Sequence, residues 1–507
     1  SSRRRHTRSS VESRGLGDVY KRQIWYDEAI TLLGTAGHAA PEWPREPAPA
    51  SLAKEQFEGA PSLGWITLQL QYGDVHPPLY YWSLSLWRRG LGFSLEAARA
   101  FSLFSSVGGA LLFYLLLRAG RIPFPWVPTL VFGLTTFGVH MGHEARAYAL
   151  ALLFILAAAL TAFLSVDAGA QNKPRAAALA VLAGLCCGAA LATNYLVLFP
   201  ILAILLWYLV CAWRESRWLA LLPSLISGAI GLLLLLVLMY QIGARPHQFA
   251  GRLGFFQQVS LLLWMNLTDF HTSMVPSKPF QYVAWGILGL LAVLSLVQIA
   301  RRWSTTECKE QRLLLLLLFL GLAPSVGLAL LNIVFDKSLS SPRYMAFALP
   351  GLAVAVSYGI TTLMTSKRTL GTGLLAVLLL LQASGINWGL EQTPEQPDSG
   401  MRSVVKAIEA SPAPSRLVVV GAGYGRGHPG TVIYELDPAT EMVVLHRDSD
   451  LDLLQDQASG YTQVCFFLSM EASTSEVENE LLQRLRGEGH YSEVNYPGAT
   501  LCLQKNG

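Results

Sequence analysis

The 507-residue sequence has little charge: only 14% of its residues are Asp, Glu, Lys or Arg, whereas 52% are hydrophobic. Ordinary soluble domains carry about 25% charged residues. The mean hydropathy is +0.39. This composition excludes a disordered protein, a disulfide-rich scaffold and a typical cytosolic enzyme. It indicates a polytopic helical membrane protein.

The sequence also lacks a basic patch. Its net charge of +4 comes from residues 1–23, which hold seven basic and two acidic residues; the rest has 31 basic and 32 acidic residues. Nucleic-acid binding is therefore not predicted.

Residues 1–23 have no apolar core or cleavage site, so they are not a signal peptide. We interpret them as an artefactual segment resembling translated adapter sequence, with a disordered basic tail as the alternative.

Cysteine is scarce, with six residues that form no metal-binding pattern. Three of them lie in apolar runs and are expected to be small core residues. Cys465 and Cys502 lie in two predicted strands near the C-terminus. A disulfide between them is compatible with an exported domain, but their spacing alone does not establish it.

Apolar runs of about 20 residues, enough to cross a bilayer, dominate the middle of the chain. We predict ten of them: 96–117, 124–141, 147–166, 175–192, 195–213, 218–240, 280–300, 312–334, 344–364 and 369–387. Residues 391–507 differ, with 17 acids, 8 bases and strands that alternate with polar helices. The predicted fold is thus mainly α, a transmembrane helical bundle over 24–390 followed by a soluble α/β domain over 391–507.

Lys and Arg are concentrated in alternate loops, which the positive-inside rule places in the cytoplasm. The loops in between, the segment 24–95 and the C-terminal domain then lie outside. Residues 76–93 are too short to span, so we expect an interfacial helix with Tyr80, Tyr81, Trp82 and Trp87 at headgroup level. An outer segment that begins at Ile24 also requires a preceding transmembrane helix, which we expect to be missing from this sequence.

Four motifs fall at the predicted outer ends of helices. They are WYDEA (25–29), DVHPPLYYW (74–82), HEARAYAL (143–150) and SPRYMAFALPGL (341–352). Acidic residues are rare at such positions unless they are paired or functional.

In order and sidedness, these motifs resemble the GT-C glycosyltransferases, in particular the protein-mannosyltransferase-like (family 39-type) and RgtA/B/C/D-like branch. The resemblance implies transfer of a sugar from a polyprenyl-phosphate carrier to an acceptor outside the cytoplasm, at the inner membrane of a bacterium. It also implies that the acid of the first outer loop is catalytic, which is Asp27, with Glu28 beside it. No nucleotide-sugar site is expected.

Such chemistry needs a base for the acceptor hydroxyl, cations or other donors for the departing phosphate, and an apolar groove for the prenyl chain. Asp27 is the candidate base, and Arg146 and Arg343 are candidate phosphate ligands. The remaining predicted substrate-binding residues are His76, Tyr80, Tyr81, Glu144 and Tyr344.

Each residue also has a purely structural interpretation. Asp27 and Glu28 could form a solvated loop pair, and His76 could cap the interfacial helix. Arg146 could pair with Glu144 or extend to lipid headgroups. Arg88 and Arg89 are expected to contact headgroups.

No metal and no cofactor are assigned. His140, His143 and Glu144 have a spacing that can bind a divalent ion, but plain polar contacts are the commoner use, and the question stays open. GAGYGRG (421–427) resembles a dinucleotide-binding loop. His428, Pro429 and Gly430 are expected to separate its glycines from the next helix, which argues against a cofactor there.

Two other classes remain as alternatives. A transporter or lipid flippase would also have many spans and intramembrane charges. We see no inverted repeat, however, and the charges gather at one face. A glycan ligase or polymerase would share the donor chemistry. The sequence does not specify the sugar, nor whether the acceptor is a lipid, a glycan or a protein. The enzyme hypothesis requires Asp27, His76, Arg146 and Arg343 to converge on one site.

Overall fold

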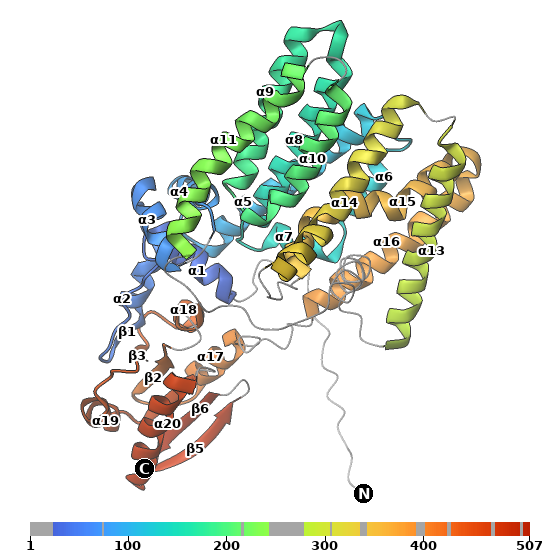
Figure 1. The fold of residues 1–507 in the computed structure, drawn as a ribbon. Helices are drawn as coiled ribbons and strands as arrows, with labels where there is room; N and C mark the ends of the chain where they lie inside the picture. The colour runs from blue at the N-terminus through green and yellow to red at the C-terminus, as the bar shows by residue number, and fades with distance from the viewer. Residues whose placement is uncertain are drawn as a thin grey trace, which may run out of the picture.

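The computed structural model describes residues 24–73, 76–213, 217–242, 278–304, 307–334, 342–391, 401–422, 427–467, 472–496 and 500–506. A helical bundle forms most of the molecule, and a small sheet domain lies beyond one end of it (Figure 1). The segment 1–23, most of the loop 241–279 and residues 423–426 lie outside the described residues.

Long apolar helices make up the bundle. Nine helices of the described ranges are long and apolar enough to cross a membrane. They are α5 (Leu95–Ala119), α8 (Tyr148–Ala168), α9 (Lys173–Leu191), α10 (Leu198–Ala212, preceded by η4, Tyr195–Val197), α11 (Arg217–Ile242), α13 (Lys278–Arg302), α14 (Cys308–Val334), α15 (Leu349–Ser366, preceded by η5, Pro342–Ala348) and α16 (Arg368–Glu391). These match nine of the ten predicted runs, and the chain is an integral membrane protein.

The remaining predicted run, 124–141, is not one helix, so that prediction was wrong. It forms two short helices, α6 (Trp126–Gly133) and α7 (Thr136–His143). Thr135 caps α7 because its hydroxyl accepts a hydrogen bond from Gly138 N (2.9 Å), a contact that competes with continuation of the helix. The two helices lead from the C-terminal end of α5 back to its N-terminal end. Just after α7, Ala145 N donates to Glu28, and Glu28 pairs with Arg99 near the start of α5.

The segment before the bundle consists of short elements: α1 (Tyr26–Ala36), β1 (Ala48–Pro49), α2 (Ala50–Lys54), η2 (Glu55–Phe57), α3 (Leu63–Gly73) and α4 (Pro78–Leu91). Helix α4 begins with a proline at its first position, which is favoured because the missing N–H has no partner there. Its 14 residues are too few to cross a bilayer, as predicted.

The predicted C-terminal α/β domain is present. It contains α17 (Met401–Ala410), β2 (Arg416–Gly421), α18 (Gly427–Glu435), β3 (Glu441–Leu445), α19 (Leu451–Ser459), β4 (Gln463–Phe467), α20 (Ala472–Gly487), β5 (Tyr491–Tyr496) and β6 (Thr500–Lys505). The sheet order is β1-β3-β2-β4-β6-β5, with β3, β2 and β4 parallel and the other pairings antiparallel. Strand β1 comes from the segment before the bundle, so residues 391–507 do not build this sheet alone.

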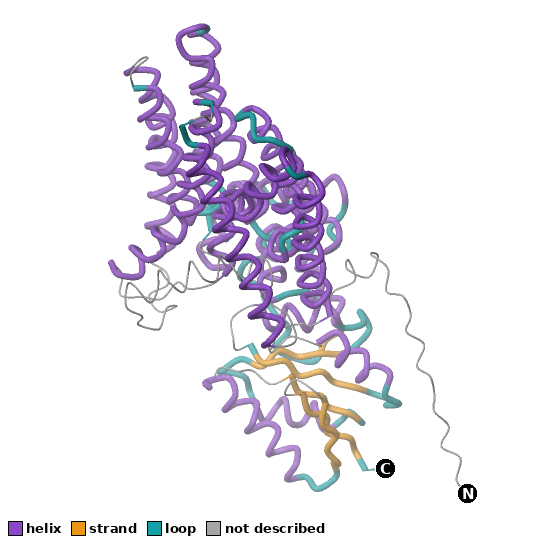
Figure 2. The backbone as a smooth tube through the Cα atoms, turned by 90° about the vertical axis from the view of Figure 1, so that its right-hand side faces the viewer, coloured by secondary structure: helices purple, strands orange, loops and turns teal. Residues whose placement is uncertain are grey.

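Figure 2 shows the strands of the sheet beyond one end of the helical bundle. Alternate residues of each central strand face two different cores. Val418 and Val420 face one side, whereas Leu417 and Val419 face the other with residues of α19 and α20. The first side continues into the bundle: its buried cluster also contains Ala29 and Leu33 of α1, Phe57, Tyr80, Tyr81, Ala98, Ala145, Val432 and Ile433. We call this cluster the shared core.

A disulfide joins Cys465 of β4 to Cys502 of β6. The two residues are directly opposite each other in the antiparallel register. The disulfide that the sequence left open is therefore formed, and it faces the shared core.

Helix α18 begins at Gly427 and includes His428, Pro429 and Gly430. The expectation that these three residues separate the glycine-rich loop from the helix was wrong. A Cβ on Gly430 would lie 3.3 Å from Ala29 Cβ. This glycine therefore serves close packing between α18 and α1.

Candidate active site

The first turn of α1 carries the two acidic residues of the WYDEA motif. Negative side chains are favoured in a first helical turn because they interact with its unpaired N–H groups and its dipole. Glu28 accepts a hydrogen bond from Trp25 N (3.1 Å), the residue that caps the helix. The local sequence thus explains both the start of α1 and the presence of acids there.

Glu28 is completely buried, and both of its carboxylate oxygens are occupied. Arg99 of α5 donates from Nε to Oε1 (2.8 Å) and from Nη2 to Oε2 (2.6 Å). Ala145 N donates to Oε1 (2.9 Å), and Trp25 N to Oε2. A carboxylate offers about four acceptor positions, so Glu28 has no position left for the proton of a substrate. Its contacts instead tie α1, α5 and the α7–α8 junction together.

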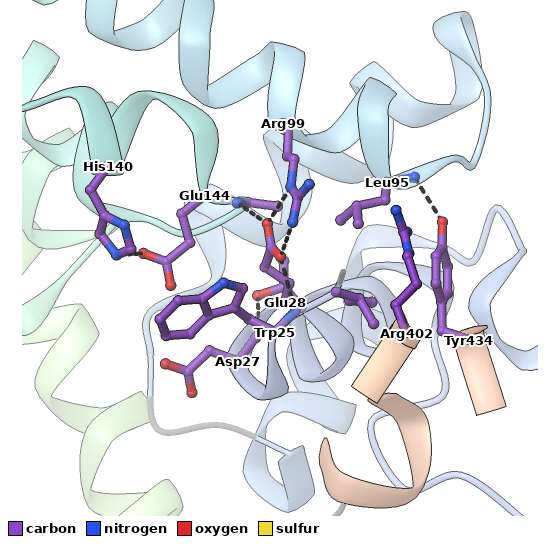
Figure 3. Close-up of polar contacts among 12 residues, drawn as sticks. Trp25, Asp27, Glu28, Leu95, Arg99, His140, Glu144, Arg402 and Tyr434 are labelled. Atoms are coloured by element: carbon purple, nitrogen blue, oxygen red, sulfur yellow. Dashed lines mark hydrogen bonds and ion pairs between the residues drawn. The ribbon is translucent and has the colours of Figure 1, made fainter. Parts of the chain in front are cut away.

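Asp27 lies differently from its neighbour. Its side chain is only partly buried, and Figure 3 shows its carboxylate pointing away from the Glu28–Arg99 pair. Its backbone is fixed, because the Asp27 carbonyl accepts from Thr31 Oγ1 (2.9 Å) and from Arg146 Nη1 (3.3 Å). The structure therefore holds the Asp27 backbone rigidly while its carboxylate faces away from the buried network.

The HEARAYAL motif forms the junction between α7 and α8, and it packs against the same turn of α1. Arg146 is 7% exposed and donates from Nη1 to Thr31 Oγ1 (3.2 Å) as well as to Asp27. Glu144 is 5% exposed and pairs with His140 Nε2 (3.3 Å), whose ring meets Trp25 edge-on. Arg146 thus contacts α1, and Glu144 contacts His140.

The DVHPPLYYW motif packs against α1. Tyr80 and Tyr81 of α4 are each 1% exposed, and the Tyr81 ring packs on Gly34. Burial raises the pKa of the Tyr80 phenol, which therefore stays neutral. The expectation that these rings stack on a sugar is wrong for this structure, because neither ring is accessible. Their place at headgroup level stays a prediction. His76 is partly buried immediately before α4, and Asp74 lies outside the described residues.

Arg88, predicted to contact lipid headgroups, is instead buried beneath α1. It is 1% exposed and donates to Leu32 O (2.9 Å), Phe57 O (2.6 Å), Phe93 O (2.9 Å) and Thr35 Oγ1. Burial lowers the pKa of this guanidinium to about 10, so it remains charged at neutral pH. Arg88 connects α4 to the C-terminal half of α1.

The fourth motif forms η5, next to the start of α8. Phe347 contacts the ring of Tyr148, with 6.3 Å between centroids. Tyr344 is partly buried against the bundle core. The side chain of Arg343 lies outside what the structure describes. Of the four residues expected to converge, Asp27 and Arg146 are in direct contact through the Asp27 carbonyl, and η5 packs against the start of α8.

A cavity of about 380 Å³ lies beside the α7–α8 junction, between α5, α7 and α8. Its lining is almost entirely apolar and includes Gly109, Val139, Met141, Gly142, His143 and Leu152. Among the described residues, no three His, Cys, Asp or Glu side chains are placed to hold a metal ion.

Arg99 is the main residue that the sequence interpretation missed. It lies within the predicted span 96–117, and a charge in such a run usually has a partner or a function. That signal was available in the sequence, but the partner, Glu28, is 71 residues away.

Fold and site together define a polytopic helical membrane protein whose polar cluster sits at the end of the bundle that meets the sheet domain. The chain is similar in structure to ArnT from Cupriavidus metallidurans in the apo state, with a TM-score of 0.52, 12% identity, and coverage of 94% of this chain and 96% of ArnT. The same protein bound to undecaprenyl phosphate aligns with a TM-score of 0.49 at 12% identity, covering 97% and 98% of the two chains. The fold is thus ArnT-like, of the GT-C type. No protein-family model and no curated protein sequence matches the chain.

Proposed function

We propose that this protein is an integral-membrane glycosyltransferase that moves a sugar from a polyprenyl-phosphate-linked donor to an extracytoplasmic acceptor. One observation carries the proposal: the two motifs WYDEA and HEARAYAL, more than 100 residues apart, meet at Asp27 through the contact between Arg146 and the Asp27 carbonyl. The ArnT-like GT-C fold supports it.

In this mechanism Asp27 is the base. Its carboxylate accepts the proton of an acceptor hydroxyl while the acceptor oxygen bonds to the anomeric carbon of the sugar. The bond from that carbon to the phosphate oxygen breaks on the opposite face, and the polyprenyl phosphate leaves with the bonding electrons. Because phosphate is a good leaving group, this inverting transfer needs one carboxylate only. Hexosyl and pentosyl donors fit the scheme equally well.

Glu28 and Arg146 position Asp27 and do not take part in the reaction themselves. Glu28 is saturated by its four donors and holds α1 against α5 and the α7–α8 junction. Arg146 fixes the Asp27 backbone, which modifies its predicted role as a phosphate ligand. That role falls chiefly to Arg343, with His76 and Tyr344 as further substrate-binding candidates, and the apolar cavity beside His143 suits part of a prenyl chain.

The site is proposed to face away from the cytoplasm of a bacterial inner membrane. Two independent features support this orientation. In the predicted topology, the Lys- and Arg-rich loops all lie on the opposite side of the membrane from this site. The Cys465–Cys502 disulfide is typical of a domain in an oxidising compartment.

The test is transfer of a labelled sugar from polyprenyl-phosphate donors by the purified protein in lipid. Asp27→Asn should lower turnover by about 10²- to 10⁴-fold, since it removes the base but keeps the size of the side chain. Asp167→Asn is the matched control, because Asp167 lies at the other end of α8 and pairs with Lys309 (2.6 Å). Equal turnover by the parent and Asp27→Asn would remove the assignment of the base. Absence of transfer with every donor, together with vectorial movement of the lipid, would favour a flippase instead.

A further inference from the structure

Helix α18 of the C-terminal domain packs directly on the helix that carries Asp27, although 400 residues separate them in sequence. A Cβ on Gly430 would lie 3.3 Å from Ala29 Cβ, 3.5 Å from Phe57 Cζ and 3.6 Å from Leu33 Cδ1. Ala29 and Leu33 are one turn apart on the same face of α1. A small residue on each helix thus allows the two helices to approach closely, and a larger side chain at position 430 would force them apart.

A buried carboxylate strengthens this contact at the entry to α1. The Glu435 side chain is 6% exposed, and its Oε1 accepts a hydrogen bond from Ile24 N (3.1 Å). Arg402 holds the same carboxylate in a two-point contact, from Nε (2.6 Å) and Nη2 (3.1 Å). Ile24 is fully buried and precedes the helix cap Trp25. Glu435 therefore fixes the chain three residues before Asp27.

The neighbouring residue fixes the entry to α5. Tyr434 Oη accepts a hydrogen bond from Leu95 N (3.1 Å), at the first residue of that helix. Burial raises the pKa of this phenol, so it stays neutral. Helix α5 supplies Arg99, the partner of Glu28. The last two residues of α18 thus fix the starts of both helices whose side chains form the Glu28–Arg99 pair. Figure 3 shows the Tyr434–Leu95 contact beside that pair.

From these contacts we infer that α18 is part of the active-site framework and that Glu435 is a positioning residue for sugar transfer. This inference rests on the proposed function. None of the α18 contacts described above is with the Asp27 carboxylate itself, so Glu435 acts through the backbone of α1. Displacing a catalytic group by about 1 Å can lower the rate about 10²-fold. Loss of the Glu435 anchor is therefore expected to reduce turnover without removing any group that touches substrate.

The first experiment compares Glu435→Ala with Gln463→Ala. Both residues are buried acceptors in the same domain, and each accepts from an arginine Nε at 2.6 Å, Arg402 and Arg416 respectively. Gln463 pairs with Arg416, the first residue of β2. Its side chain accepts from Ser411 and Arg416, neither of which belongs to α18 or α1. Glu435→Ala should lower kcat about 10- to 100-fold with little change in KM for the donor. Glu435→Gln should recover most of the loss, because its amide oxygen still accepts from Ile24 N. Gln463→Ala should keep the kcat of the parent.

An accessibility measurement makes the test independent of activity. Ala29 is fully buried beneath α18. In an Ala29→Cys background, Glu435→Ala should increase the rate of modification by a membrane-impermeant maleimide, whereas Gln463→Ala should not. If the parent transfers no sugar, the proposed function fails, yet this labelling still decides whether α18 anchors α1. Unchanged labelling in Glu435→Ala would overturn the inference, and so would an unchanged kcat.

A disulfide across the contact tests whether the docked arrangement is the active one. In Ala29→Cys/Gly430→Cys the two Cβ atoms would start about 3.3 Å apart, just below the range of about 3.5–4.5 Å in natural disulfides. The oxidised double variant should form this bond and transfer sugar at a rate close to that of its reduced form. Loss of turnover on oxidation that is restored by reduction would show that α18 must separate from α1, and would overturn the inference.

Discussion

The bundle core and the shared core are stabilised in different ways. The polar side chains buried in the described bundle core are neutral, such as Ser357, Thr361 and Gln382. The lipid-facing surface of the same helices is apolar, with leucines such as Leu233, Leu290 and Leu380 largely exposed. Charged side chains are instead buried beside the shared core: Glu28, Arg88 and Arg99 are at most 1% exposed. Apolar packing in lipid distinguishes weakly between similar helix positions, because lipid tails are as apolar as leucine. A buried charge tolerates only the arrangement that supplies its partners. We infer that the polar contacts of the shared core set the geometry around Asp27, and that the bundle provides the support.

The largest effect is expected from breaking the Glu28–Arg99 pair. Arg99→Met removes the two-point partner of a fully buried carboxylate and leaves that charge without its main compensation. The free energy of unfolding should fall by about 3–5 kcal/mol. Denaturant titration in mixed micelles, followed by tryptophan fluorescence, measures this loss.

A matched pair of variants sharpens this prediction. Leu380→Ala in α16 truncates a side chain that is 69% exposed on the bundle surface and should have a much smaller effect. The double variant Glu28→Gln/Arg99→Met should regain part of the stability, because no unpaired buried charge remains. If Arg99→Met proves no worse than Leu380→Ala, the shared core does not depend on its charges.

Arg88 and Arg89 provide the second comparison, between adjacent arginines in α4. Arg88→Met removes hydrogen bonds to Leu32 O, Phe57 O and Phe93 O in the buried interior, and should lower the free energy of unfolding by about 3 kcal/mol. Arg89 is exposed and contacts only Pro61 O among the described hydrogen bonds, so Arg89→Met should have little effect. The same titration measures both. Similar losses for the two variants would contradict the assignment of Arg88 to the shared core.

The same contrast explains how far the sequence could predict this structure. Long apolar runs predicted nine spans, because crossing a bilayer requires about 20 such residues. The break at Thr135 was missed, since a local hydroxyl contact leaves hydropathy unchanged. Short apolar runs that alternate with polar helical stretches predicted the C-terminal strands. It gave no sign of β1, whose two residues are paired only through tertiary contact.

The candidate site was predicted in outline but not in its internal roles. Asp27 and Glu28 are adjacent and chemically alike, so the sequence could not show which of the two pairs with Arg99. Tyr80 and Tyr81 were expected at a surface because aromatic residues favour membrane interfaces. Their burial follows from the packing of α4 against α1. This packing involves residues such as Gly34, which no hydropathy pattern or motif marks in the sequence.

The disulfide is expected to have an intermediate effect. Cys465→Ala/Cys502→Ala, or reduction of the parent, should lower the stability of the sheet domain by about 2 kcal/mol, because the bond closes a long segment of the unfolded chain. Cys308→Ser is the control, since Cys308 is a free and exposed thiol at the start of α14. Limited proteolysis with and without reductant measures the difference. Equal resistance under both conditions would show that the sheet is held by packing alone.

The smallest effect is expected at the exposed edge of the sheet domain, where Arg45 pairs with Asp448 (3.0 Å). The hydrogen bond from Arg45 lowers the pKa of the Asp448 carboxyl. The folded-state pKa then lies below the unfolded value, so any stabilisation is present above the unfolded pKa and is lost as the pH falls through the folded one. Both side chains are more than half exposed, with relative exposures of 59% and 71%, and solvent and salt screen such a pair strongly. Asp448→Asn should therefore leave the unfolding midpoint at neutral pH unchanged, as measured by the same fluorescence titration at low and high salt. A loss as large as that of Arg99→Met would mean that exposed and buried charges contribute alike, and the distinction drawn between the two kinds of contact would fail.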